Sequence, residues 1–150
     1  MNGWLQRNSV NLLRISVSII FLWFGVLKFL EGVSPVQHLA ISTIRSLTFG
    51  VFSDSTIIYS LAFTEVVVGL SLLFDVYVKQ VLYILYFQIV GTFAPLVIYP
   101  EVTFTSPPFF LSLEGQYIVK NLVILAAGLV ISTYHCDEDL TCRGAEDTFP

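Results

Sequence analysis

Four long apolar runs, over residues 12–30, 56–74, 81–99 and 117–134, alternate with shorter polar stretches along the chain. Each run is near the roughly 20 residues that an α-helix, rising about 1.5 Å per residue, needs to cross about 30 Å of hydrocarbon. The runs are continuous, whereas the strands of a membrane β-barrel alternate apolar and polar residues. The pattern therefore predicts an all-α, polytopic membrane protein built as a bundle of four transmembrane helices.

The composition points to the same class of protein. Of the 150 residues, 55% are hydrophobic and only 12% are charged, against about 45–50% and about 25% in soluble domains. A soluble bundle of four helices would need polar outer faces, which these runs lack. The formal net charge is −4 and no basic patch suits a nucleic acid. The lipid bilayer is the expected partner of the surface, and nucleic acid is not.

Two connecting segments are long enough to have structure of their own. In residues 35–52 apolar side chains recur at helical spacing, which predicts a short amphipathic helix along the outer membrane interface. Residues 99–116 contain three prolines and four aromatic residues. Proline interrupts a regular helix and aromatic side chains favour the headgroup level, so we expect a rigid, folded-back lid there.

Basic residues beside the runs indicate the orientation. Arg7, Arg14, Lys79 and Arg143 fall on one side of the four predicted spans. The opposite side carries Arg45 in a loop, with Lys28 and Lys120 just inside the membrane ends, so the bias is small. Because lysine and arginine concentrate on the cytoplasmic side, we expect both termini in the cytoplasm.

One membrane domain is expected over residues 1–134, followed by an acidic C-terminal tail over residues 135–150. The tail contains Cys136 and Cys142, whose C-x5-C spacing fits neither a redox C-x-x-C motif nor a common zinc pattern. In the cytoplasm these thiols would stay reduced. We expect no metal site and no covalently bound cofactor.

Each apolar run carries a stripe of small or polar residues at helical spacing. Small residues let membrane helices approach closely, and polar residues pair across the contact. We therefore expect the four stripes to meet in the interior of the bundle. The stripes are Arg14, Ser18, Phe21, Gly25 and Lys28 in the first run, Ala62, Glu65 and Gly69 in the second, Gln88, Gly91, Thr92 and Pro95 in the third, and Lys120, Asn121, Ala127 and Gly128 in the fourth.

Glu65 is the candidate that most needs an explanation, because an ionised group at mid-membrane costs about 2.5–3.5 kcal/mol unless it finds a partner or water. One hypothesis is a hydrogen-bond network that only determines helix register, with the lysines reaching the surface. The other is an outward-opening pocket whose carboxylate holds a proton or bonds a ligand carbonyl or hydroxyl. Burial and a nearby lysine act in opposite directions and leave its protonation state open. The candidate ligand-binding residues are Glu65, Gln88, Thr92, Lys28, Lys120 and Asn121.

Three segments resemble the DoxX family of small four-helix membrane proteins: LLRISVSIIFLWFGVLKFLEG, FTEVVVGLSLLF, and the block from GTFAPLVIYPEV to LEGQYIVKNLVILAAGLVI. The specific features are G-x-x-K, a mid-run Glu, P-E followed by P-P-F, and L-E-G-Q-Y-x-x-K-N-L, over approximately residues 10–134. The resemblance implies a four-helix bundle in a bacterial inner membrane. It marks as recurring positions Gly25, Lys28, Glu65, Gln88, Glu114, Gln116, Lys120 and Asn121.

The resemblance also implies an association with membrane redox chemistry, since relatives are linked to thiosulfate- or quinol-oxidising complexes and to oxidative-stress resistance. It implies an accessory subunit that binds a quinone or a similar lipid-soluble ligand, with membrane or secreted redox proteins as partners. The apolar runs contain no histidine or cysteine to ligate haem and no glycine-rich phosphate fingerprint. We therefore do not expect an enzyme acting on its own. A ligand-free structural or assembly protein and a small proton-coupled transporter, which would need a homo-oligomer, stay open as alternatives.

Overall fold

The structure is a computed structural model that describes residues 3–30, 37–107 and 109–146, with side chains from residue 8 to residue 135 of these ranges. Within them, four helices are long and apolar enough to cross a membrane, which confirms the predicted four-helix bundle. Each begins a few residues before its apolar run, because the helix includes a more polar first turn. They are Asn8–Lys28, Asp54–Phe74, Val78–Ile98 and Leu113–His135.

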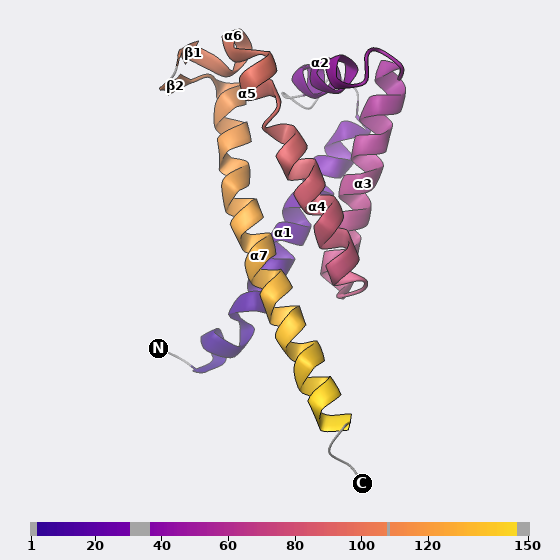
Figure 1. The fold of residues 1–150 in the computed structure, drawn as a ribbon, viewed down its shortest axis with the longest axis vertical. Coiled ribbons are helices and arrows are strands. Elements are labelled where there is room, and N and C mark those ends of the chain that lie inside the picture. The colour runs from indigo at the N-terminus through magenta and orange to yellow at the C-terminus, as the bar shows by residue number, and fades with distance from the viewer. Residues whose placement is uncertain (1–2, 31–36, 108, 147–150) are drawn as a thin grey trace.

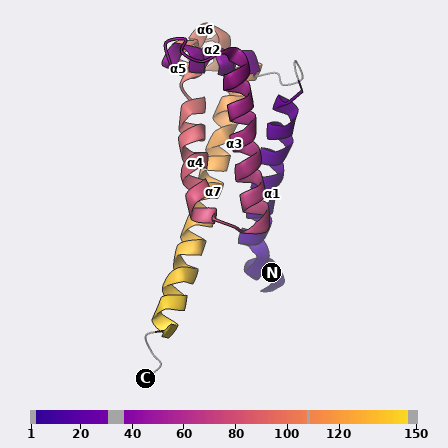
Figure 2. The same cartoon turned by 90° about the vertical axis from the view of Figure 1, so that its right-hand side faces the viewer.

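The bundle consists of α1 (Gly3–Lys28), α3 (Asp54–Phe74), α4 (Val78–Thr92) and α7 (Leu113–Glu146) (Figures 1 and 2). Helix α1 begins, and α7 leaves the bundle, at one end, which we call the terminal end. The opposite end carries the longer connections, and we call it the loop end. Helix α7 continues well beyond the other three helices, so the first part of the predicted tail is helical. The side chains of Arg7, Cys136, Cys142 and Arg143 lie outside the described part of the chain.

Helix α2 (Gln37–Leu47) lies across the loop end of the bundle, where a short amphipathic helix was expected (Figure 1). Its apolar side packs inward through Leu39, and the hydroxyl of the buried Thr43 donates to the Leu39 carbonyl. On its exposed side the Arg45 guanidinium forms an ion pair with the carboxylate of Asp54, the first residue of α3. This pair fastens the end of the surface helix to the start of the second long helix.

The proline-rich connection folds back over the loop end without a long helix, as expected. It begins with the single turn α6 (Pro100–Thr103), directly after the single turn α5 (Pro95–Ile98) that ends the third span. Each has proline in its first turn, where a missing N–H costs nothing. A hairpin of β1 (Phe104–Ser106) and β2 (Phe110–Leu111) follows. Helix α7 packs closely against this connection at Gly115, where an added Cβ would lie 2.1 Å from the carbonyl oxygen of Thr103 in α6 and 2.9 Å from the side chain of Leu111 in β2.

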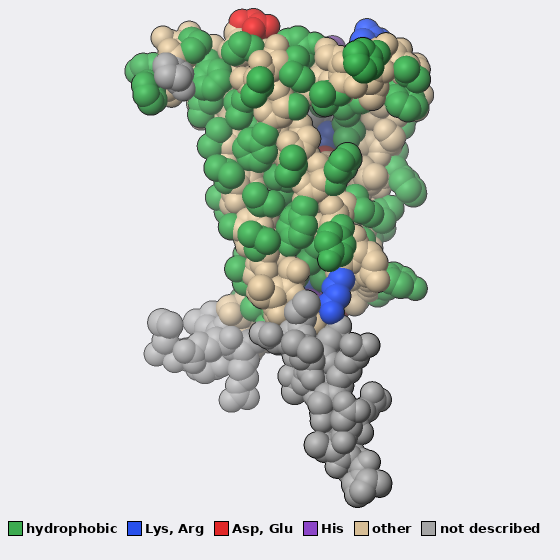
Figure 3. Space-filling view, viewed as in Figure 1, with side chains coloured by type: hydrophobic (Ala, Val, Ile, Leu, Met, Phe, Trp, Pro, Cys, Tyr) green, Lys and Arg blue, Asp and Glu red, His purple; other side chains and the backbone are tan. Residues whose placement is uncertain are grey.

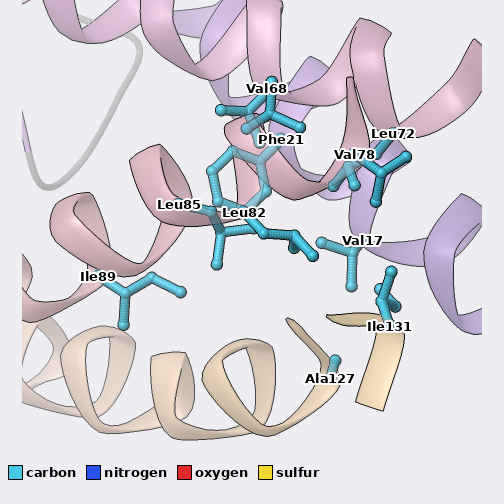
Figure 4. Close-up of a cluster of buried hydrophobic side chains, with 11 residues drawn as sticks. Val17, Phe21, Val68, Leu72, Val78, Leu82, Leu85, Ile89, Ala127 and Ile131 are labelled. Atoms are coloured by element: carbon cyan, nitrogen blue, oxygen red, sulfur yellow. The ribbon is translucent and has the colours of Figure 1, made fainter. Parts of the chain in front are cut away.

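Buried apolar side chains from all four long helices interlock in the bundle (Figure 4). Among them Leu72, Leu85 and Ile131 have no exposed surface. The outer surface is also apolar: hydrophobic side chains cover the sides of the bundle in Figure 3, and the charged side chains visible on the surface lie toward its ends. An apolar outside and continuous helical hydrogen bonding are what a bilayer requires. The four helices indicate a multi-pass membrane protein.

Candidate functional site: a polar cluster inside the helix bundle

Glu65 forms an ion pair with Lys28 within the apolar span. The Lys28 Nζ lies 2.5 Å from each carboxylate oxygen, and the two side chains are only 13% and 12% exposed. Side chains on a helix lean toward its N-terminus. Since α1 and α3 run in opposite directions, Lys28 leans toward the middle of the bundle and Glu65 leans toward the loop end (Figure 1). The two charged groups therefore meet although Lys28 lies near the end of its helix.

Two glycines make the pair possible by letting α1 and α3 approach closely. A Cβ on Gly25 would lie 3.0 Å from the Cβ of Glu65, and a Cβ on Gly69 would lie 2.7 Å from the Cγ of Leu22. At the same contact the buried Ser18 hydroxyl donates to the Gly69 carbonyl at 2.7 Å. The predicted stripes of α1 and α3 thus face each other, and the ion pair lies along this close contact.

Gln88 of α4 supplies the third group. Its Nε2 donates to Glu65 Oε1 at 2.9 Å. A carboxylate oxygen can only accept, so the amide NH₂ must face Glu65 and the amide oxygen must face elsewhere. That oxygen, Gln88 Oε1, is buried and has no hydrogen-bond partner among the described residues.

Thr92, one turn further along α4, joins the fourth long helix to the group. Asn121 of α7 donates from Nδ2 to Thr92 Oγ1 at 3.0 Å, and the Thr92 hydroxyl donates to the Ile89 carbonyl at 2.6 Å. Five of the six candidate residues therefore lie close together inside the bundle, and all four long helices contribute at least one of them. We call them the polar cluster: Lys28, Glu65, Gln88, Thr92 and Asn121.

Lys120 is the candidate that the structure places elsewhere. Its side chain is exposed, and its ammonium group lies 5.5 Å from the centre of the Tyr117 ring. Neighbouring residues on a helix point about 100° apart, so Asn121 can face inward while Lys120 faces the surface. Gly91 also differs from the expectation: it is exposed, and an added Cβ would meet nothing within 4 Å.

The side of the bundle is hollowed near the height of the polar cluster. Figure 3 shows this hollow between α4 and α3, below α2, with blue and red side-chain atoms on its floor. The small exposed fractions of the Lys28 and Glu65 side chains agree with such an opening. The hollow opens on the side of the bundle, the surface that four membrane-spanning helices present to lipid.

The terminal end holds a second charged group that sequence reasoning missed. Asp75 Oδ1 accepts from Arg14 Nη1 at 3.1 Å and from His135 Nε2 at 2.9 Å. The Nδ1 of His135 lies 3.0 Å from the Ile131 carbonyl oxygen of its own helix. The signal was present in the sequence, since Asp75 and His135 each follow an apolar run that ends on the same side.

A separate cavity of about 240 Å³ lies at the loop end, between α2 and the start of α3. Its lining includes Gln37, Ile41, Asp54 and Tyr59. Gln37 Oε1 is buried without a partner among the described residues, and Asp54 is already paired with Arg45. The lining residues do not include members of the polar cluster.

No group of three or more His, Cys, Asp or Glu side chains that could hold a metal ion is present in the described part of the chain. Comparisons with protein-family models, with curated proteins and with solved structures found no match for this chain. The resemblance to the DoxX family therefore stays a prediction from the sequence motifs.

Proposed function

We propose that this chain is a DoxX-like protein of a bacterial inner membrane that holds a quinone or a similar lipid-soluble ligand at the polar cluster. It would act as an accessory subunit of a membrane redox system. The observation that supports this proposal is the Glu65 carboxylate, held by Lys28 and Gln88 inside an apolar span and still 12% exposed, in a bundle whose side is hollowed (Figure 3). An ionisable group inside a membrane is costly, and it is by default a candidate ligand or proton site.

The residues of the cluster fit a ligand that carries a polar head on an apolar body. Lys28, Gln88 and Asn121 present N–H groups that a ring carbonyl would accept from, and Gln88 adds an unpaired acceptor for a ring hydroxyl. A bound quinone would supply the capacity to carry electrons and protons between partner proteins. The chain itself would bind and orient the ring and exclude water from it. Partners would be membrane or secreted redox proteins.

A structural or assembly role is the second candidate, and one observation favours it. Glu65 already accepts bonds to both carboxylate oxygens from Lys28 and a further bond from Gln88. The carboxylate therefore has hydrogen-bond partners from two other helices without any ligand, as in a network that only fixes helix packing.

Mass spectrometry of the small molecules retained after purification in mild detergent separates the two roles. We would compare the wild type with Glu65→Leu and with Phe63→Leu, a change at an exposed neighbour on α3. A quinone present in stoichiometric amount in the wild type and in Phe63→Leu, but absent from Glu65→Leu, is the expected result. Bulk phospholipid alone in all three, with Glu65→Leu melting at a lower temperature, would establish the structural role instead.

A further inference from the structure

One acceptor atom of the polar cluster, Gln88 Oε1, has no donor. Within the cluster it is the only described side-chain atom that is buried without any partner. The nitrogen atoms of the cluster each have at least one bond, from Lys28 to Glu65, from Gln88 to Glu65 and from Asn121 to Thr92. The Thr92 hydroxyl already donates its one hydrogen to the Ile89 carbonyl.

A flip of the Gln88 side-chain amide would not give its oxygen a donor. A flipped amide would place its oxygen against the Glu65 carboxylate, where both atoms are acceptors and repel each other. Both carboxylate oxygens of Glu65 already accept from Lys28 Nζ, so neither is placed to donate to a flipped amide. The unpaired oxygen is thus a consequence of the charge pair, and some other group must supply the hydrogen.

We infer that the polar cluster selects a lipid-soluble compound that bears a hydroxyl group, so that it holds a quinol in preference to the matching quinone. A hydroxyl can donate to Gln88 Oε1 and still accept a second bond from the remaining N–H of Lys28 or Asn121. A quinone carbonyl only accepts, and would leave the buried Gln88 oxygen unpaired. This inference rests on the proposed function, because it names the chemical form of the ligand in the same site.

The preference has a consequence for redox chemistry. A site that binds the reduced form tenfold more tightly raises the reduction potential of the bound two-electron couple by about 30 mV. The chain would then retain the quinol until a partner oxidises it, and would release the quinone more readily.

The test uses two probes that differ only in the hydrogen: 4-nonylphenol and its methyl ether, 4-nonylanisole. Neither probe changes oxidation state during the measurement. Retention of each probe would be measured on the full-length protein in lipid nanodiscs, with empty nanodiscs subtracted. Leaving a buried acceptor unpaired is worth roughly a factor of ten in affinity, so the phenol should bind about tenfold more tightly than the ether. A matched pair of decylhydroquinone and decylbenzoquinone, in oxygen-free buffer, should show the same order.

Two variants test whether the Gln88 oxygen causes the preference for the phenol. In Gln88→Met, which keeps the side-chain length and removes the acceptor, the phenol and the ether should bind equally. Gln80→Met makes the same chemical change at an exposed position at the start of α4 and should keep the tenfold preference. A preference that survives in Gln88→Met contradicts the inference.

The wild-type measurement alone keeps the inference testable if Gln88→Met does not fold. Equal binding of phenol and ether by the wild type would overturn the donor preference and leave the proposed ligand site standing. Absence of saturable binding for either probe, and for either quinone form, would contradict the proposed function itself.

Discussion

Glu65 is stable inside an apolar helix because two donors from two other helices reach its carboxylate. The sequence pointed to this residue correctly, since a single carboxylate in a long apolar run needs a partner. The sequence contains two lysines at a similar depth, Lys28 and Lys120, and helical spacing does not show which of them pairs with Glu65. The structure selects Lys28, whose side chain leans from α1 into the bundle, and turns Lys120 to the surface.

Removing the charge of Lys28 should lower the stability of the protein more than removing the charge of Glu65. Lys28→Met leaves the carboxylate without a counter-charge in the bundle, and breaking a buried pair in this way costs on the order of 3 kcal/mol of stability. Glu65→Gln should cost less and should still fold, because the amide can bond to Gln88 and the lysine can swing toward the nearby membrane surface. Thermal unfolding in one detergent, followed by circular dichroism, compares the variants.

The double variant Lys28→Met/Glu65→Gln supplies the control for that comparison. It removes both charges, so it should recover most of the stability that Lys28→Met loses. If the double variant were as unstable as Lys28→Met, or if Glu65→Gln alone failed to fold, the ion pair would not be what stabilises this part of the bundle.

The contact between α1 and α3 shows what small residues contribute at the scale of helices. The sequence stripes placed Gly25 and Gly69 in the interior, and both lie there. The same reasoning placed Gly91 in the interior, and there it was wrong. Gln88 stands at the border of the buried face of α4, with the buried Ile89 on one side and Gly91 about 160° away from Ile89 around the helix. Spacing alone identifies a face of a helix, but the extent to which neighbours cover that face depends on how the helices tilt.

Adding one methyl group at two glycines should separate close packing from open surface. In Gly69→Ala the new Cβ would lie 2.7 Å from Leu22 Cγ and 3.0 Å from the Leu22 backbone nitrogen, so α1 and α3 must move apart. We expect a loss of about 1–3 kcal/mol. In Gly91→Ala the methyl group meets nothing, and the stability should stay equal or rise by up to about 1 kcal/mol because glycine weakens a helix.

Unfolding of the two alanine variants under identical conditions makes the measurement. A Gly69→Ala protein as stable as the wild type would show that the helices are not in close contact at that position. Destabilisation by Gly91→Ala would show that the exposed face of α4 is covered by something in the membrane, such as a second copy of the chain.

The whole molecule has two unlike ends. Four crossings place these ends on opposite sides of the membrane. The exposed Phe49, after α2, lies at the loop end, and Val76, in the turn between α3 and α4, lies at the terminal end. Basic residues favour cytoplasmic termini, which would direct the loop end outward. The hollow beside the polar cluster would then lie in the outer half of the membrane.

Single cysteines test this orientation in intact cells. With Cys136 and Cys142 replaced by serine, Phe49→Cys should react with a membrane-impermeant maleimide added outside, and Val76→Cys should react only after the cells are permeabilised. The reverse pattern would mean that both termini face outward. Labelling of both cysteines from one side would contradict the single crossing, by α3, that the fold places between the two positions.

By itself the sequence determined the class of protein, the four helices and the short helix at one end, because hydrocarbon demands long apolar segments with internally satisfied backbones. It also determined that a polar group must lie inside, since a carboxylate in an apolar run has to find donors. The tertiary structure alone decided which donors these are, that Lys120 is excluded, and that Arg14, Asp75 and His135 meet at the other end. Helical periodicity gives the face of each residue, whereas partners in space depend on the direction, rotation and tilt of four separate helices. Those quantities result from packing between distant segments, and no local pattern contains them.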